Sequence, residues 1–103
     1  MKKEMKFTDM RLFTTKQQTL DMINVGYPSP MNQYGPPAYS IGELMNYAKQ
    51  CSGRLIVIEA NTGWMVHVDG SCIRYEREEL VDALVEFCIF IKENKFYPSK
   101  FEY

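Results

Sequence analysis

Three short segments in the second half of the chain carry side chains with a two-residue period. They cover residues 54–60, 64–68 and 71–76 and are rich in β-branched and aromatic residues, a pattern typical of strands. The linkers between them, Asn61-Thr62-Gly63 and Asp69-Gly70, have the length and composition of hairpin turns. Parallel strands need a crossover connection of about a dozen residues or more, so these segments predict an antiparallel meander.

Turn length also predicts which side chains share a face of the sheet. A three-residue loop at 61–63 pairs Ala60 with Trp64, and a two-residue turn at 69–70 pairs Val66 with Ile73. The face that then packs on the core collects Ile56, Ile58, Ala60, Trp64, Val66, Val68, Ile73 and Tyr75. The second face holds Leu55, Val57, Glu59, Met65, His67, Asp69, Cys72 and Arg74.

Segments with helical spacing flank the predicted sheet in the sequence. Capping boxes at Thr15 and Ser40 predict short helices over about 15–25 and 41–51. A longer helix follows the last strand, with an apolar stripe formed by Leu80, Leu84, Phe87, Cys88 and Ile91. Its apolar arc is wide, so we expect it to meet more than the sheet. We therefore predict an α+β fold with two short helices, a three-stranded antiparallel meander and a long C-terminal helix packed on the sheet.

The chain has the size of one domain. Its 103 residues, 46% of them hydrophobic, fit a single core, with 1–12 as a flexible arm and 27–39 as a Pro/Tyr-rich loop. No apolar run approaches the ~20 residues that span a bilayer. Asp9 and Arg11 interrupt the apolar stretch that a signal peptide would need. We expect a cytoplasmic protein with no membrane contact.

Opposite charges gather in two places, although the formal net charge is −1. Residues 76–86 carry a net −4, and residues 1–16 a net +3. The basic residues of the first segment include Lys2, Lys3, Lys6 and Arg11. Such a start either binds nucleic acid or an acidic partner, or forms a solvated arm. A nucleic-acid-binding regulator is therefore an alternative, which the pI near 5.8 and the acidic start of the last helix disfavour.

Residues that carry chemistry are few and scattered. Cys51, Cys72 and Cys88 form no CxxC pair and fit apolar positions, so we expect buried thiols rather than a disulfide framework or a zinc site. A nucleophile pair of Cys72 and His67 can be drawn on the second face, but the sequence shows no oxyanion site or other activating feature. We expect a non-enzymatic protein with no catalytic residue, no cofactor and no metal site.

The Pro/Tyr-rich loop allows two interpretations. It holds four of the five prolines and three tyrosines. Tyr27, Tyr34 and Tyr39 form either a recognition surface, as aromatic residues do at interfaces, or a rigid strap packed over the core. Phe96 and Tyr97 in the tail are expected to dock on the domain, because exposed aromatic rings are unfavourable in a solvated tail.

The second sheet face has a surplus of apolar side chains. Leu55, Val57 and Met65 are apolar where a solvent-facing strand should be polar, so we expect the chain itself or a protein partner to cover them. The partner includes a second copy in a homodimer. We predict a small accessory or protein-interaction protein, whose candidate interaction surface comprises Leu55, Val57, Met65, His67, Tyr27, Tyr34 and Tyr39.

Several local strings carry a resemblance to known sequences. They are Lys16-Gln17 with Leu20, Gly26-Tyr27-Pro28, Thr62-Gly63-Trp64 and the runs 38–44, 79–84 and 91–94, spread over most of residues 15–96. In these strings the chain resembles small uncharacterised proteins encoded by phages and mobile elements of gut Bacteroidetes. The resemblance implies a phage or mobile-element setting. It assigns no functional residue, because the strings fall at caps, turns and helix faces.

Overall fold

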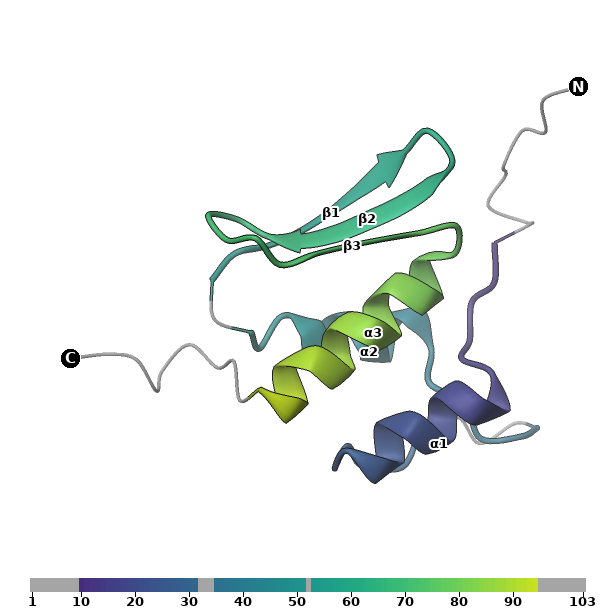
Figure 1. Cartoon of the computed structure of the whole chain (residues 1–103). Helices are drawn as coiled ribbons and strands as arrows, with labels where there is room; N and C mark the ends of the chain where they lie inside the picture. Colours follow the sequence, from purple (N-terminus) through teal and green to yellow (C-terminus); the bar gives the residue numbers. More distant parts are fainter. Residues whose placement is uncertain (1–9, 32–34, 52, 95–103) are drawn as a thin grey trace, which may run out of the picture.

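The computed structural model describes residues 10–31, 35–51 and 53–94, and in them three helices lie on one side of a three-stranded sheet (Figure 1). The strands form an antiparallel sheet of order β1-β2-β3. The α+β fold predicted from the sequence is confirmed. In chain order the elements are α1 (Lys16–Asn24), α2 (Ile41–Ala48), β1 (Leu55–Ala60), β2 (Gly63–Val68), β3 (Arg74–Arg77) and α3 (Leu80–Glu93).

Both predicted capping boxes are present at the starts of α1 and α2. Thr15 Oγ1 accepts from the backbone N–H of Gln18, and the Gln18 side chain accepts in return from the Thr15 N–H at 3.0 Å. Ser40 and Glu43 exchange the same pair of hydrogen bonds. These bonds satisfy amide groups that a helix start leaves without intrahelical partners, which is why the two short helices begin at these residues.

Helix α3 is the centre of the packing. Its predicted stripe is buried along its whole length, and Val81 and Val85 are buried with it. One side of α3 packs on β2 and β3, and it also contacts α1 and α2, so the prediction that it meets more than the sheet is confirmed. Neither α3 nor any other helix in the described ranges is both long and apolar enough to cross a membrane.

The predicted faces of β1 are reversed in the structure. The β1–β2 connection is the two-residue turn Asn61-Thr62, so Ala60 pairs with Gly63 and the register differs by one residue from the prediction. Gly63 is a strand residue with a packing constraint, because a Cβ there would lie 2.3 Å from the carbonyl oxygen of Arg77. Leu55 and Val57 therefore lie on the core face, while Ile56 and Ile58 lie on the other face.

The faces of β2 and β3 are as predicted, although their register also differs. Val68 donates to Ile73 at 3.2 Å and Val66 pairs with Tyr75, which makes residues 69–72 a four-residue connection. This register differs from the prediction by two residues, and a shift of two leaves every side chain on its face. Val66, Val68, Ile73 and Tyr75 therefore remain on the core side.

The Pro/Tyr-rich loop is attached to the core through two of its tyrosines. The Tyr27 hydroxyl donates to the carbonyl oxygen of Cys88 in α3 at 2.6 Å, and its ring packs 4.7 Å from that of Tyr47. Tyr39 is completely buried, and its hydroxyl donates to the carbonyl oxygen of Pro28. For Tyr27 and Tyr39 the strap interpretation is correct and the recognition surface is wrong. Tyr34 lies outside the described residues, as do Lys2, Lys3, Lys6, Phe96 and Tyr97.

Candidate interaction surface

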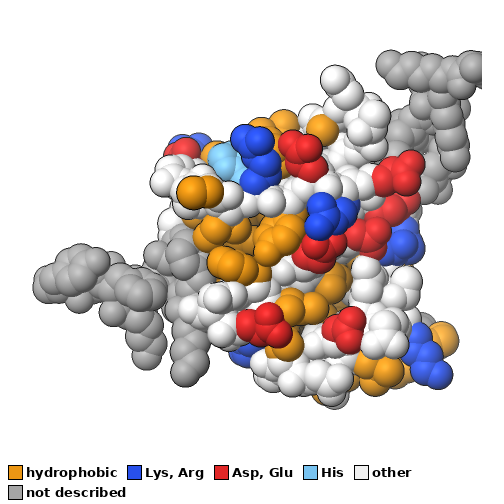
Figure 2. Space-filling model, viewed as in Figure 1, with side chains coloured by type: hydrophobic (Ala, Val, Ile, Leu, Met, Phe, Trp, Pro, Cys, Tyr) orange, Lys and Arg blue, Asp and Glu red, His pale blue; other side chains and the backbone are white. Residues whose placement is uncertain are grey.

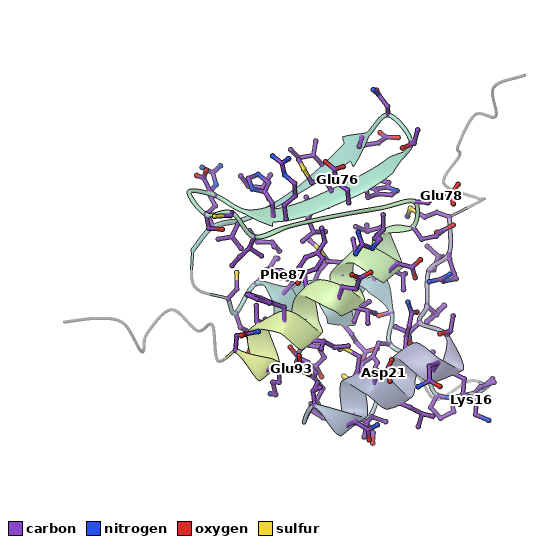
Figure 3. The ribbon with its side chains drawn as sticks, in the orientation of Figure 1. Lys16, Asp21, Glu76, Glu78, Phe87 and Glu93 are labelled. Carbon is purple, nitrogen blue, oxygen red and sulfur yellow. The ribbon has the colours of Figure 1, made fainter. Side chains whose placement is uncertain are left out.

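The face of the sheet that points away from the helices carries two rows of side chains, which we call the outer sheet face. One row runs across the strands as Ile58, Met65 and Glu76, and the other as Ile56, His67 and Arg74. Figure 3 shows Glu76 on this side of the sheet, opposite Phe87 of α3. Helix α3 packs on the opposite face, and α1 and α2 lie on the same side of the sheet as α3, so no described helix covers the outer sheet face (Figure 1).

Polarity changes from one end of these rows to the other. The residues on β1 are aliphatic, and Ile58 is 43% exposed even though its neighbours are Ile56 and Met65. The residues on β3 are Arg74 and Glu76, both exposed and charged. Figure 2 shows charged side chains of both signs over β3. The outer sheet face is therefore an aliphatic surface bordered on one side by charge, which is the usual anatomy of a protein interface.

Sequence reasoning found part of this surface and missed its most exposed apolar member. Met65 and His67 lie on the outer sheet face as predicted, and both are half-buried. Leu55 and Val57 do not belong to it, since the register places them against the core. Ile58 and Ile56 were assigned to the core face because Gly63 resembles a turn residue. A turn of Asn61-Thr62 alone would have placed them correctly.

Strand β1 also has a free edge, which its hydrogen-bond pattern defines. The N–H of Asp69 donates to the carbonyl oxygen of Arg54 at 2.8 Å, so residues 54 and 69 form a hydrogen-bonded pair. In an antiparallel ladder such pairs alternate along the strand. The even-numbered residues of β1 therefore direct their backbone groups to β2, and Leu55, Val57 and Glu59 direct theirs away from the sheet. No other described segment pairs with β1.

The cysteines are not arranged for nucleophilic chemistry. Burial raises the pKa of Cys88 to about 12 and also raises the pKa of Cys51, so both thiols stay protonated at neutral pH. Cys72 is exposed, which corrects the expectation of a third buried thiol. It lies in the 69–72 connection, and His67 pairs instead with Arg74. Within the described ranges no hydrogen bond joins His67 to Cys72, and no cluster of three potential metal ligands occurs.

A hollow of about 290 Å³ lies at the β1–β2 turn. Its lining is formed by Ala60, Thr62, Gly63, Trp64, Glu76, Arg77 and Glu78. Glu76 and Arg77 are consecutive strand residues, so their side chains leave the sheet on opposite faces and cannot converge on one ligand. Arg77 is held instead by Glu86 of α3, to which its Nε donates at 2.6 Å. The hollow therefore does not bring Glu76 and Arg77 together as a pair.

The described part of the basic start is bound to the domain. A side-chain nitrogen of Arg11 donates to a carboxylate oxygen of Asp82, and the Arg11 backbone N–H donates to Glu79 at 3.0 Å. Both acids lie at the start of α3, where negative charge also complements the helix dipole. The charge of Arg11 is thus paired within the chain.

Comparison with known proteins adds no relative. A scan against protein-family models, a search of curated proteins and a search of solved structures each found no match to this chain.

Proposed function

We propose that this protein is a small non-enzymatic accessory protein that binds other proteins through its outer sheet face, in a phage or mobile-element setting. The observation that carries the proposal is the exposure of Ile58, 43%, on a sheet face that none of the three described helices covers. A sheet face that meets water is normally polar. When a partner removes its aliphatic side chains from water, the free energy of the complex falls by about 25 cal/mol per Å² of apolar surface buried.

The charged side chains at the β3 end add selectivity. Arg74 and Glu76 carry opposite charges and border the aliphatic rows, so a partner with the complementary pattern binds in one orientation. His67, half-buried in the middle of the surface, offers a hydrogen-bonding ring to the same partner.

The experiment begins with capture of partners from host cells and continues with one purified, identified partner. Met65→Lys places a charge in the middle of the outer sheet face and should raise the dissociation constant at least ~10-fold, since a charge would lose its hydration there. Leu20→Lys is the matched control, because Leu20 is 45% exposed and lies on α1. It should change the dissociation constant less than ~2-fold.

Circular dichroism of each variant checks that the fold is intact. If Leu20→Lys removes binding while Met65→Lys leaves it unchanged, the surface of α1 is the binding site and the proposal is wrong. A partner that binds both variants as tightly as the original chain also contradicts it.

A further inference from the structure

The free edge of β1 has the chemistry of a pairing site for another strand. Leu55, Val57 and Glu59 present backbone N–H donors and C=O acceptors that form no ladder with any described strand, and such groups form a template for a further strand. The strand is six residues long, contains no proline or lysine, and has a single charge, Glu59. These are the features that natural edge strands usually avoid when they have to stay unpaired.

The helical layer covers the core side of this edge only in part. Helix α3 packs on β2 and β3, whereas Leu55 and Val57 on the core side of β1 are each half-buried. An added strand would extend the sheet and cover these two side chains further. The same strand would also continue the aliphatic part of the outer sheet face.

We propose that the occupant is a second copy of this chain, with the two β1 strands antiparallel and the two-fold axis at Val57. This inference rests on the proposed function and names one partner for it. Two three-stranded sheets would then form one six-stranded sheet. The alternation of backbone groups allows only odd-numbered residues to pair with odd-numbered ones, so that the outward N–H and C=O groups of both strands meet.

Charge selects this register among those that the alternation allows. With the axis at Val57, Leu55 pairs with the partner's Glu59, and the two glutamates stand four residues apart along the ladder. With the axis at Ile58, each Glu59 would be a diagonal neighbour of the partner's Glu59, and like charges that close oppose pairing. With the axis at Ile56, the strand would pair beyond its own start, at Gly53.

The chosen register also gives a reciprocal aliphatic contact. Ile56 lies directly opposite the partner's Ile58, and the symmetry repeats the pair on the other side of the axis. These are non-hydrogen-bonded positions, at which Cα atoms are about 4.5 Å apart and side chains are closest. The exposed side chain of Ile58 thus finds its cover at the centre of the interface.

Disulfide trapping tests the register with single cysteines. Ile56→Cys and Ile58→Cys are each made with Cys72→Ser, which removes the exposed native thiol, while Cys51 and Cys88 stay buried. One of the two chains carries a longer tag, so that mixed and like dimers differ in size. Mild oxidation of the mixture should give mixed dimers, because opposed Cα atoms are within the 4.4 to 6.8 Å range of a disulfide, by general strand geometry.

Each variant oxidised alone is the control. Like positions are offset by two residues along the ladder, roughly 8 Å between Cα atoms, and should cross-link at least ~10-fold more slowly. Faster cross-linking of Ile58→Cys alone would place the axis at Ile58, and of Ile56→Cys alone at Ile56. Either result overturns the register proposed here.

Sedimentation equilibrium of the unmodified chain completes the test. A dimer at micromolar concentration is the expected result. A monomer at all concentrations, together with no mixed cross-link, overturns the inference. The same result is expected if a segment of another protein, and not a second copy of this chain, pairs with β1. The proposed function would still stand in that case if binding of the identified partner remained sensitive to Met65→Lys.

Discussion

The two edges of the same sheet differ in length, charge and attachment. Strand β1 has six residues with one charge, and contacts only β2 among the described strands. Strand β3 has four residues, of which three are charged, and its Arg77 is fixed by Glu86 of α3. Short length and charge are the means by which natural edges avoid association. The comparison shows that one edge is protected and the other is open, next to the aliphatic half of the outer sheet face.

Proline at matched edge positions should separate the two edges most strongly. Val57→Pro removes an outward N–H of β1, and Glu76→Pro removes an outward N–H of β3, so neither change breaks a bond inside the sheet. Val57→Pro should raise the dimer dissociation constant by about 30-fold or more, since both hydrogen bonds at the axis are lost. Glu76→Pro should leave it within ~2-fold.

Sedimentation velocity measures both constants, and circular dichroism checks that both variants are folded. If both prolines raised the dimer dissociation constant equally, the two edges would not differ in function, and β1 would not be the one open edge of the sheet.

Removing the charges of β3 should open the protected edge. Arg74→Thr combined with Arg77→Thr gives β3 a charge-poor edge and releases it from Glu86. With both edges open, pairing is no longer closed, and light scattering should show species larger than a dimer that grow with concentration. The control Lys16→Thr with Lys49→Thr makes the same change in net charge on exposed helix ends and should remain a dimer. Equal growth in both double variants would assign the effect to net charge.

High pH should destabilise the interior of the domain without acting directly on the contact at the β1 edge. Burial raises the pKa of Cys88 from 9.0 and of Tyr39 from 10.0, each to about 12. At a pH between the unfolded-state and the folded-state pKa of each group, the unfolded chain has lost a proton that the folded chain retains. The free energy of unfolding therefore falls as pH rises above about 9. We expect a loss of roughly 4 kcal/mol by pH 11, measured by urea unfolding.

The paired β1 strands contain no side chain that titrates between pH 9 and 11. Dimer dissociation should therefore follow unfolding in this range. Dissociation of a still-folded chain at pH 10 would show that a titrating group outside β1 controls the contact.

Neutralising Glu59 should have the smallest effect. In the register centred on Val57 the two glutamates are far apart, so Glu59→Gln should change the dimer dissociation constant less than ~2-fold at low salt. A severalfold tighter dimer would indicate neighbouring glutamates, which is the arrangement centred on Ile58.

The sequence predicts the elements of this protein well, since their signals are local. The capping boxes at Thr15 and Ser40 and the stripe of α3 are each contained within a few residues, and all appear in the structure. The two turns join the predicted strands, but they span 61–62 and 69–72 rather than the predicted 61–63 and 69–70. The faces of β1 depend on a contact that is not local. Gly63 has to be glycine because of the backbone at Arg77, and that approach is set by how β3 leaves the sheet.

Only part of the candidate surface was predictable from the sequence. Met65 and His67 follow from the period of β2, which survives any register shift of two. The burial of Tyr27 and Tyr39 required knowledge of the hydrogen bonds to Cys88 and Pro28, which composition cannot supply. To predict that Ile58 is exposed, the turn had to be assigned as 61–62, one residue shorter than 61–63.

Amide hydrogen exchange, resolved by residue and measured at several protein concentrations, tests the open edge of β1 most directly. The amides of Leu55, Val57 and Glu59 should exchange rapidly in dilute solution and become protected as the concentration rises into the dimer range. The outward amides of Arg74 and Glu76 on β3 should stay unprotected throughout. If the β1 amides exchange rapidly at every concentration, or if both edges become protected together, the account of one open and one protected edge is wrong.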